Sequence, residues 1–171
     1  MTTNKGTKRT VLTQQELKEN LHYDPETGNF TWIKNNGRKG VAGTVADKDF
    51  GKCYNIYFNR TIYLSHRLAW FYIHGYMPKN MIDHKDGDPY NNKIDNLREA
   101  TCAENQQNQR KPRKDNATGY LGVCWNKKDR KYIAKINKNK SRIHIGSFDT
   151  AEEAAAAYLN TKRRIHEFCT I

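Results

Sequence analysis

Residues 82–105 read IDHKDGDPYNNKIDNLREATCAEN and bring metal-binding and proton-transfer groups close together in the chain. His84 follows Asp83 at the end of a short strand-like run, and the turn-forming residues 86–89 come directly after it. An imidazole acts as a general base near pH 7, and a carboxylate holds a divalent cation beside a phosphate. Because adjacent strand residues point to opposite faces, the two side chains converge only if the chain bends there.

Two amides and a helix start complete the pattern. Asn96 follows His84 by twelve residues and precedes a short strand, where its amide can brace the loop through local backbone hydrogen bonds. Thr101-x-x-Glu104 is a capping-box pattern, which places Asn105 in the first turns of a helix, near enough to reach a metal held by Asp83. The stretch therefore predicts a strand, a loop, a second strand and a helix around one ion.

The charge of the chain points to a polyanionic partner. Lys and Arg number 30 against 18 Asp and Glu, so the net charge of +12 exceeds what solubility requires and favours nucleic acid. There is no apolar stretch of about 18 residues and no basic amphipathic helix, so a membrane partner is disfavoured. Residues 1–10 are not followed by an apolar signal-peptide core, and we expect a cytoplasmic protein.

The cysteines are spaced too widely for a structural zinc site or a disulfide framework. None of the four forms a Cys-x-x-Cys pair, and they stand at Cys53, Cys102, Cys124 and Cys169. With 36% hydrophobic residues, the 171-residue chain has enough apolar material for one modest core or two small ones, and the pattern favours two.

The first predicted domain spans residues 1–108. Thr13-x-x-Glu16 begins a helix that we expect to include Leu17 and Leu21. Three later runs alternate like strands and predict one small antiparallel sheet, at 29–33, 54–58 and 61–64. Residues 66–75 have helical spacing and should cover that sheet.

A polar segment separates this domain from a second one. Residues 109–118 form a basic linker, whose composition fits a DNA-tracking tether and simple solvation equally well. In the second domain, 119–171, three alternating runs predict an antiparallel sheet, at 119–125, 131–136 and 142–146. Thr150 then starts an Ala-rich helix that packs on one face. A cationic face that can enter a major groove remains on the other side, with Lys135, Asn137, Arg142 and His144.

The metal-binding stretch resembles the HNH nucleases of the phage homing-endonuclease type. The resemblance rests on Asp83-His84-x-Asp86-Gly87, Asn96-Leu97-Arg98 and Glu104-Asn105, preceded by His66-Arg67-Leu68. It implies a ββα-metal core at about 64–108, with His84 deprotonating water and Asn96 bracing the loop. It further implies that Asp83 and Asn105 hold one divalent metal, Mg²⁺ or another such as Mn²⁺. Possible phosphate contacts are His66, Arg67 and Arg98.

The second domain resembles the APETALA2 type of DNA-binding domain of plant ethylene-response factors. The resemblance rests mainly on scaffold positions, including Gly122-Val123, Ile145-Gly146-x-Phe148-Asp149 and Glu153-Ala154-Ala155. It implies a small three-stranded antiparallel sheet packed on one helix. The positions that it places on DNA are Asn126, Lys128, Lys131, Lys135, Asn137, Arg142 and His144.

Taken together, these features predict an α+β protein that is a site-specific DNA endonuclease of the homing type, with a single divalent metal and a histidine general base. Double-stranded DNA is the expected partner, no protein partner is implied, and the host cell would be bacterial if the chain is phage-encoded. A sequence-specific DNA-binding regulator with an inactive nuclease fold is the alternative. Charge alone would also suit an RNA-binding protein.

Overall fold

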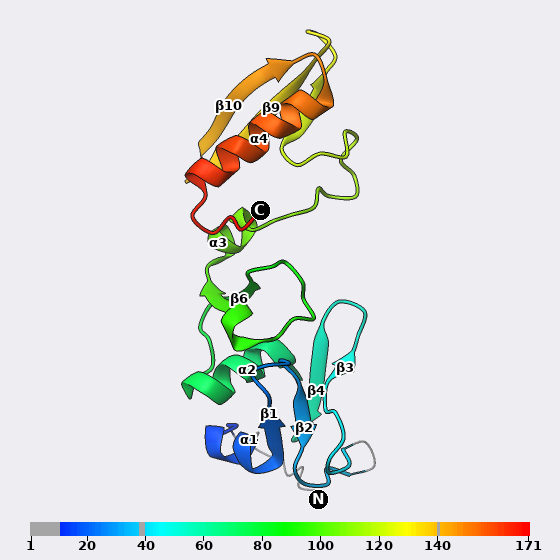
Figure 1. The fold of residues 1–171 in the computed structure, drawn as a ribbon, viewed down its shortest axis with the longest axis vertical. Coiled ribbons are helices and arrows are strands. Elements are labelled where there is room, and N and C mark those ends of the chain that lie inside the picture. Colours follow the sequence, from blue (N-terminus) through cyan, green and yellow to red (C-terminus); the bar gives the residue numbers. More distant parts are fainter. Residues whose placement is uncertain (1–10, 38–39, 140) are drawn as a thin grey trace, which may run out of the picture. The chain divides into compact units, whose positions relative to one another are not determined.

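The computed structural model describes residues 11–37, 40–139 and 141–171, so the basic segment 1–10 lies outside the described part. The fold mixes helices with small antiparallel sheets (Figure 1), which confirms the α+β prediction at that level. The chain divides into two compact units. One comprises Met1–Ile82 with Pro89–Leu97, and the other comprises Asp83–Asp88 with Arg98–Ile171.

The first unit begins with helix α1 (Gln14–Asn20), where the Thr13 hydroxyl accepts a hydrogen bond from the Glu16 N–H at 3.1 Å, as an N-cap should. The prediction that Leu21 is helical is wrong. Leu21 has an extended backbone, with φ −131°, and starts β1 (Leu21–Tyr23), which pairs antiparallel with β2 (Phe30–Trp32). The chain is a strand rather than a helix here because the alternation of a strand buries Leu21 and Tyr23 on one side.

A second small sheet follows β2. The three runs predicted to form one sheet therefore belong to two separate sheets. Strands β3 (Lys48–Asp49), β4 (Tyr54–Phe58) and β5 (Thr61–Leu64) are antiparallel in that order. Both residues of the β4–β5 turn, Asn59 and Arg60, have positive φ, which suits a two-residue hairpin.

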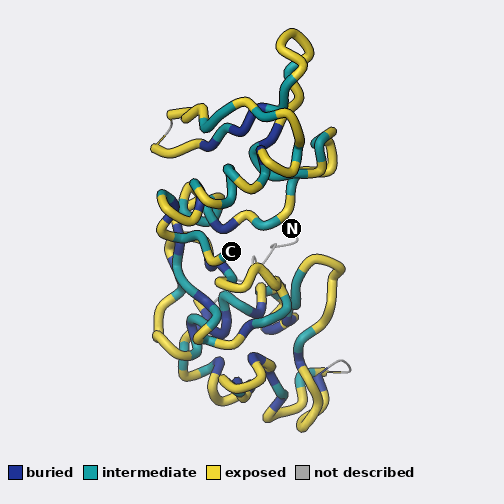
Figure 2. The backbone as a smooth tube through the Cα atoms, turned by 45° about the horizontal axis from the view of Figure 1, so that its top comes forward, coloured by how far each residue is buried: buried dark blue, intermediate teal, exposed yellow. Residues whose placement is uncertain are grey.

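Helix α2 (Ser65–His74) contacts β4 and β5, as predicted for a helix covering the sheet. It ends at Gly75, whose φ of 79° is left-handed. Its buried face joins the core of the first unit, whose residues are dark blue in Figure 2 and include Leu17, Tyr23, Phe30, Ile56, Leu68, Ala69 and Phe71.

The stretch that holds the predicted chemistry has its elements in the predicted order. Strand β6 (Met81–His84) pairs with β7 (Leu97–Ala100), and a 3₁₀ turn, η1 (Ile94–Asn96), precedes β7. Helix α3 (Cys102–Gln107) begins with both bonds of the capping box between Thr101 and Glu104.

The predicted three-stranded sheet after the linker is present. Strands β8 (Val123–Asn126), β9 (Lys131–Lys138) and β10 (Ser141–Phe148) are antiparallel in the order β10-β9-β8. The first strand starts at Val123 rather than at Gly119. Gly119 and Gly122 have φ of 73° and 69°, and a Cβ at Gly122 would lie 2.0 Å from the Tyr158 ring.

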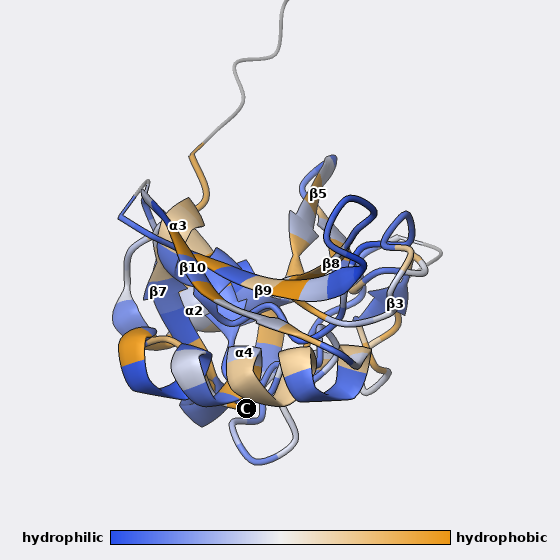
Figure 3. Cartoon of the chain, turned by 90° about the horizontal axis from the view of Figure 1, so that it is seen from above, coloured by the Kyte–Doolittle hydropathy of each residue, from blue (hydrophilic) through white to orange (hydrophobic). Residues whose placement is uncertain are grey.

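Helix α4 (Ala151–Ile165) lies along one face of this sheet (Figure 3), with a complete capping box between Thr150 and Glu153. Its Ala154 packs with Val123 and Ala134 in a small core. Small side chains permit this close approach. No helix in the described ranges combines the length and apolarity that crossing a bilayer requires.

Candidate functional site

Asp83 lies at the end of β6 and is only 5% exposed, so its charge requires partners. Arg98, in the adjacent strand β7, supplies them through Nε at 2.9 Å and Nη2 at 2.8 Å, both to Oδ2. One charge-assisted hydrogen bond and a second close ion-pair contact fix the carboxylate in position. Sequence reasoning predicted a phosphate contact for Arg98 and missed its pairing with Asp83.

Asn108 holds the same carboxylate from the other side. Its Nδ2 lies 3.3 Å from Oδ1 and 3.2 Å from Oδ2 of Asp83, and 2.8 Å from the His84 carbonyl oxygen. Asn108 is buried directly after α3, three residues beyond Asn105. Sequence reasoning missed it. The only available signal was its helical spacing from Asn105.

His84 is half-buried and begins the bend that the turn residues predict. The Gly87 N–H donates to the His84 carbonyl at 2.9 Å, and Gly87 has φ 75°. The Asp86 carboxylate accepts from the Asp88 N–H at 2.9 Å. A Cβ at Gly87 would lie 2.4 Å from the Cδ of Arg110, so a larger residue would have to displace that side chain and also adopt a left-handed backbone.

Asn96 makes the local bond expected of a loop brace, because its Nδ2 donates to the Asn91 carbonyl at 2.8 Å. The neighbouring Asn92 is buried, and its carbonyl accepts from the Tyr23 hydroxyl at 2.7 Å. The loop before β7 is therefore tied both to itself and to the core of the first unit.

The oxygen donors present suit a hard divalent cation. A carboxylate offers about four lone-pair positions, of which the Arg98 contacts use Oδ2 of Asp83 and Asn108 Nδ2 lies near both oxygens. Asn105 lies within α3, where its backbone N–H bonds to the Thr101 carbonyl at 2.9 Å. In the described part of the chain no group of three His, Cys, Asp or Glu side chains is placed to hold a metal ion together. A metal at Asp83 would thus depend on amide and water oxygens as well.

The other two predicted phosphate contacts lie in α2. The guanidinium of Arg67 donates to the Pro78 carbonyl at 2.6 Å and to the Asn80 carbonyl at 2.9 Å, so it fastens the segment between α2 and β6. His66 is half-buried in the first turn of the helix. A phosphate contact at either position stays a prediction.

The strand register places the predicted DNA-contacting residues of the second domain on one face. Arg142 lies opposite Asn137, and His144 lies opposite Lys135, so all four side chains share the face away from buried Ala134. Asn137, Arg142 and His144 are exposed, and Arg142 Nε lies 3.4 Å from Asn137 Oδ1. This arrangement agrees with the alternation of the sequence.

Two residues of this set are engaged locally. Asn126 accepts from the Lys128 N–H at 3.0 Å and donates to Asp129 at 2.6 Å, which organises the β8–β9 turn. Lys131 pairs with Asp149. Lys128 is exposed in the same turn. The β8–β9 turn therefore exposes the Lys128 side chain on a backbone that the hydrogen bonds of Asn126 stabilise.

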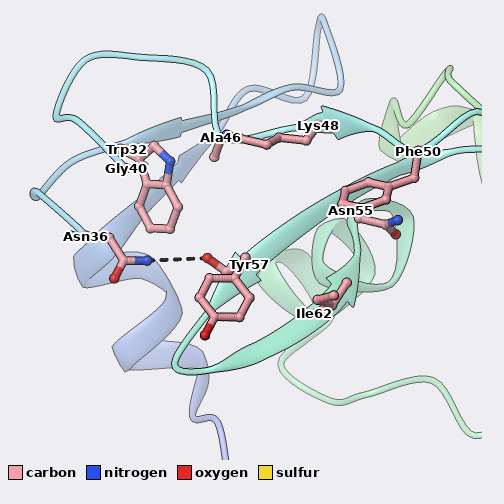
Figure 4. Close-up of a pocket in the computed structure, with 9 residues that line it drawn as sticks. All are labelled: Trp32, Asn36, Gly40, Ala46, Lys48, Phe50, Asn55, Tyr57 and Ile62. Atoms are coloured by element: carbon pink, nitrogen blue, oxygen red, sulfur yellow. Dashed lines mark hydrogen bonds between the residues drawn. The ribbon is translucent and has the colours of Figure 1, made fainter. Parts of the chain in front are cut away.

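A pocket of about 430 Å³ in the first unit lacks hydrolytic chemistry (Figure 4). Its walls are mainly apolar and include Trp32, Phe50, Tyr57 and Ile62. Lys48 is the one ionisable lining group besides the Tyr57 phenol among the described residues. Among the described residues that line it there is no carboxylate or imidazole, so this pocket is not the predicted site.

Comparison with known proteins agrees with both resemblances. Residues 63–107 match the family model of HNH endonucleases, and residues 118–167 match that of the AP2 domain. Protein 3.8 of Escherichia phage T7 is 34% identical to this chain over 102 residues, which cover 59% of this chain and 83% of that protein. No solved structure matches the chain significantly.

Proposed function

This chain belongs to the family of Protein 3.8 of Escherichia phage T7 and carries an HNH endonuclease domain followed by an AP2 domain, and from this we propose that it is a site-specific DNA endonuclease of the homing type. The observation that supports activity is the placement of Asp83 beside His84 at the end of β6, with the carboxylate held by Arg98 and Asn108. Apolar residues often replace a buried ion pair without loss of stability, so stability alone does not explain a charge at this point.

In the proposed domain organisation, the nuclease domain spans 1–108, a basic linker 109–118 and the DNA-binding domain 119–171. Strands β6 and β7 with helix α3 form the ββα-metal core. Double-stranded DNA is the proposed substrate. Because the matched relative is a phage protein, we place the activity in the cytoplasm of a bacterial host.

His84 is the proposed general base, which takes a proton from the water that attacks the phosphorus. Asp83 and Asn105 would hold the divalent ion, Mg²⁺ or Mn²⁺, through a carboxylate and an amide oxygen. That ion supplies charge stabilisation at the phosphate oxygens when bound. Asn96 keeps the loop before β7 in shape through its bond to the Asn91 carbonyl.

The exposed face of the β8–β10 sheet is the proposed DNA-reading surface. Its cationic and hydrogen-bonding side chains, including Lys135, Arg142 and His144, suit phosphates and base edges in a major groove. Under this proposal, the sheet selects the site and the nuclease domain cuts there.

Cleavage of supercoiled duplex DNA tests the proposal. Wild-type protein with Mg²⁺ should give nicked or linear product, and EDTA should abolish cutting. His84→Ala should lower the rate by about 10²–10⁴-fold while DNA binding persists. His22→Ala is the matched control because His22 is exposed in β1, in the other unit. Wild-type rates for the His84 variant would refute the assignment.

A sequence-specific regulator is the second candidate, and one feature favours it. Arg98 forms an ion pair with Asp83, an arrangement that also occurs in purely structural cores. Tight binding without cleavage, on DNA shown to contain the cognate site, would support this function. Preference for RNA over duplex DNA in competition would contradict both candidates.

A further inference from the structure

Residues 168–171 lie beyond both family matches, yet they return to the loop that follows β6. The Thr170 hydroxyl lies 2.6 Å from the Oδ1 of Asn108 and also within hydrogen-bond distance of the Lys85 carbonyl. Its single proton serves one of these acceptors at a time. The hydroxyl oxygen in turn accepts from Arg110 Nη2 at 2.6 Å, and Arg110 also donates to the Lys85 carbonyl at 2.9 Å.

Phe168 makes a second set of contacts, with Arg98. The Arg98 Nη2 donates to the Phe168 carbonyl at 2.6 Å, and the guanidinium carbon lies 4.2 Å from the centre of the Phe168 ring. A guanidinium stacked on an aromatic face and bonded at its edge has little freedom to rotate. Phe168 therefore fixes the plane in which Arg98 meets Asp83.

The other two residues of this tail, Cys169 and Ile171, contact α4 and the residue that follows it. The Cys169 N–H donates to the His166 carbonyl at 3.1 Å, and Arg163 Nε, on α4, donates to the Ile171 carbonyl at 2.9 Å. The four residues thus form a bridge between α4 and the loop after β6, which we name the C-terminal clasp.

Within the described ranges, Arg98 and Asn108 both hold the Asp83 carboxylate, and each of them is bonded to a different residue of the clasp. We propose that Phe168 and Thr170 are positioning residues for the nuclease site, acting on Asp83 through Arg98 and Asn108. This inference rests on the proposed metal-binding role of Asp83. Partners in the outer shell of a metal site typically change affinity or activity by about 10–100-fold when removed.

Metal affinity without DNA is the sharpest test, because it excludes the DNA-binding step. Titration of the full-length, EDTA-stripped protein with Mn²⁺, followed by electron paramagnetic resonance, should show about 10-fold or greater weakening in Thr170→Val and Phe168→Ala. Thr170→Ser keeps the hydroxyl and should retain most of the wild-type affinity. Glu167→Gln, an exposed neighbour of the clasp, is the control and should bind as wild type.

Two more readouts separate the clasp from general destabilisation. DNA affinity in EDTA should be unchanged in the clasp variants, because the β8–β10 face is intact. Hydrogen exchange of the peptide spanning 83–88 should quicken in Thr170→Val but not in Thr170→Ser. Wild-type Mn²⁺ affinity in both Thr170→Val and Phe168→Ala, with unchanged exchange, would overturn the proposal.

The same measurements distinguish failure of the clasp from failure of the nuclease assignment. If wild-type protein bound no Mn²⁺ and cut no DNA, the metal role of Asp83 would fall, and with it the proposed effect on metal. Hydrogen exchange at 83–88 would still decide whether the clasp orders this loop. If wild-type protein bound metal and the clasp variants matched it, only the clasp inference would fail.

Discussion

Arg98→Met would show how much the buried pair with Asp83 stabilises the metal-free protein. Arg98 and Asp83 meet through two contacts of 2.8 and 2.9 Å, and their side chains are 20% and 6% exposed. Removing one partner of a buried ion pair costs about 3–5 kcal/mol, because the remaining charge stays desolvated. Since Arg98 keeps some solvent contact and Asn108 still bonds the carboxylate, we expect the lower end, about 3 kcal/mol.

The double variant D83N/R98M separates the pair from its individual residues. The double variant has no unpaired buried charge. Its loss of unfolding free energy should therefore be smaller than the sum of the losses in the two single variants by about 2 kcal/mol. Thermal unfolding followed by circular dichroism in EDTA measures these differences. At about 2–4 °C for each kcal/mol in a chain of this size, Arg98→Met should lower the midpoint by roughly 6–12 °C.

Arg164→Met is the matched control, because Arg164 is exposed on α4. Surface substitutions of this kind stay within about 0.5 kcal/mol. If Arg98→Met lowered the midpoint no more than Arg164→Met does, the Asp83–Arg98 pair would not stabilise the fold. The argument that Asp83 is held rigidly by this pair would then fail.

Three further changes test other parts of the structure. Thr101→Val removes the hydroxyl that caps α3 through the Glu104 N–H, so it should cost about 1 kcal/mol in urea unfolding and slow cleavage, whereas Thr101→Ser should not. Burial lowers the pKa of Lys162, whose ammonium bonds to the Gln109 carbonyl. Between this lowered pKa and the ordinary value of 10.5, the unfolded chain therefore binds more protons than the folded protein, so the contribution of Lys162 to stability should rise with pH. This rise should disappear in Lys162→Met. An identical slope of stability against pH in both proteins would contradict the prediction. If Arg142 contacts one phosphate, Arg142→Ala should make the slope of log K for DNA binding against log salt concentration less negative by about 0.9 in anisotropy titrations. The cleavage rate at saturating DNA should be unchanged. An unchanged slope would show that Arg142 does not contact a phosphate.

Local sequence patterns predicted those elements whose stabilising interactions join residues close together in the sequence. The alternation in β9 and β10 predicted both the strands and the shared face of Lys135 and Arg142. The capping-box pattern at Thr101 and the N-cap residue Thr150 located the starts of α3 and α4 to the residue. In each case the interaction that fixes the element lies within a few residues of it.

The errors arose where two local patterns competed. Leu21 satisfied helical spacing with Leu17 equally well, but pairing with Trp32 buries it in a strand. The start of β8 depended on the approach of Tyr158 to Gly122, which is 36 residues distant in the sequence and leaves no local signal.

The surroundings of the candidate site were the least predictable part. Motif spacing identified Asp83, but the contacts that hold it include Arg98, 15 residues away, and Asn108, 25 residues away. The clasp contacts span 70 residues for Phe168 and 62 for Thr170. Neither Phe168 nor Thr170 belongs to a periodic pattern, so only the folded chain shows their proximity.

The 70 residues between Arg98 and Phe168 also separate them in time during synthesis. Translation proceeds at about 5–20 residues per second, so a growing chain contains Arg98 for roughly 4–14 s before Phe168 is added. Throughout that interval the segment with Asp83 and His84 exists without its clasp, while the sheet and α4 are still being made. The ribosome therefore completes the β8–β10 sheet and α4 before the last contacts around Asp83 can form.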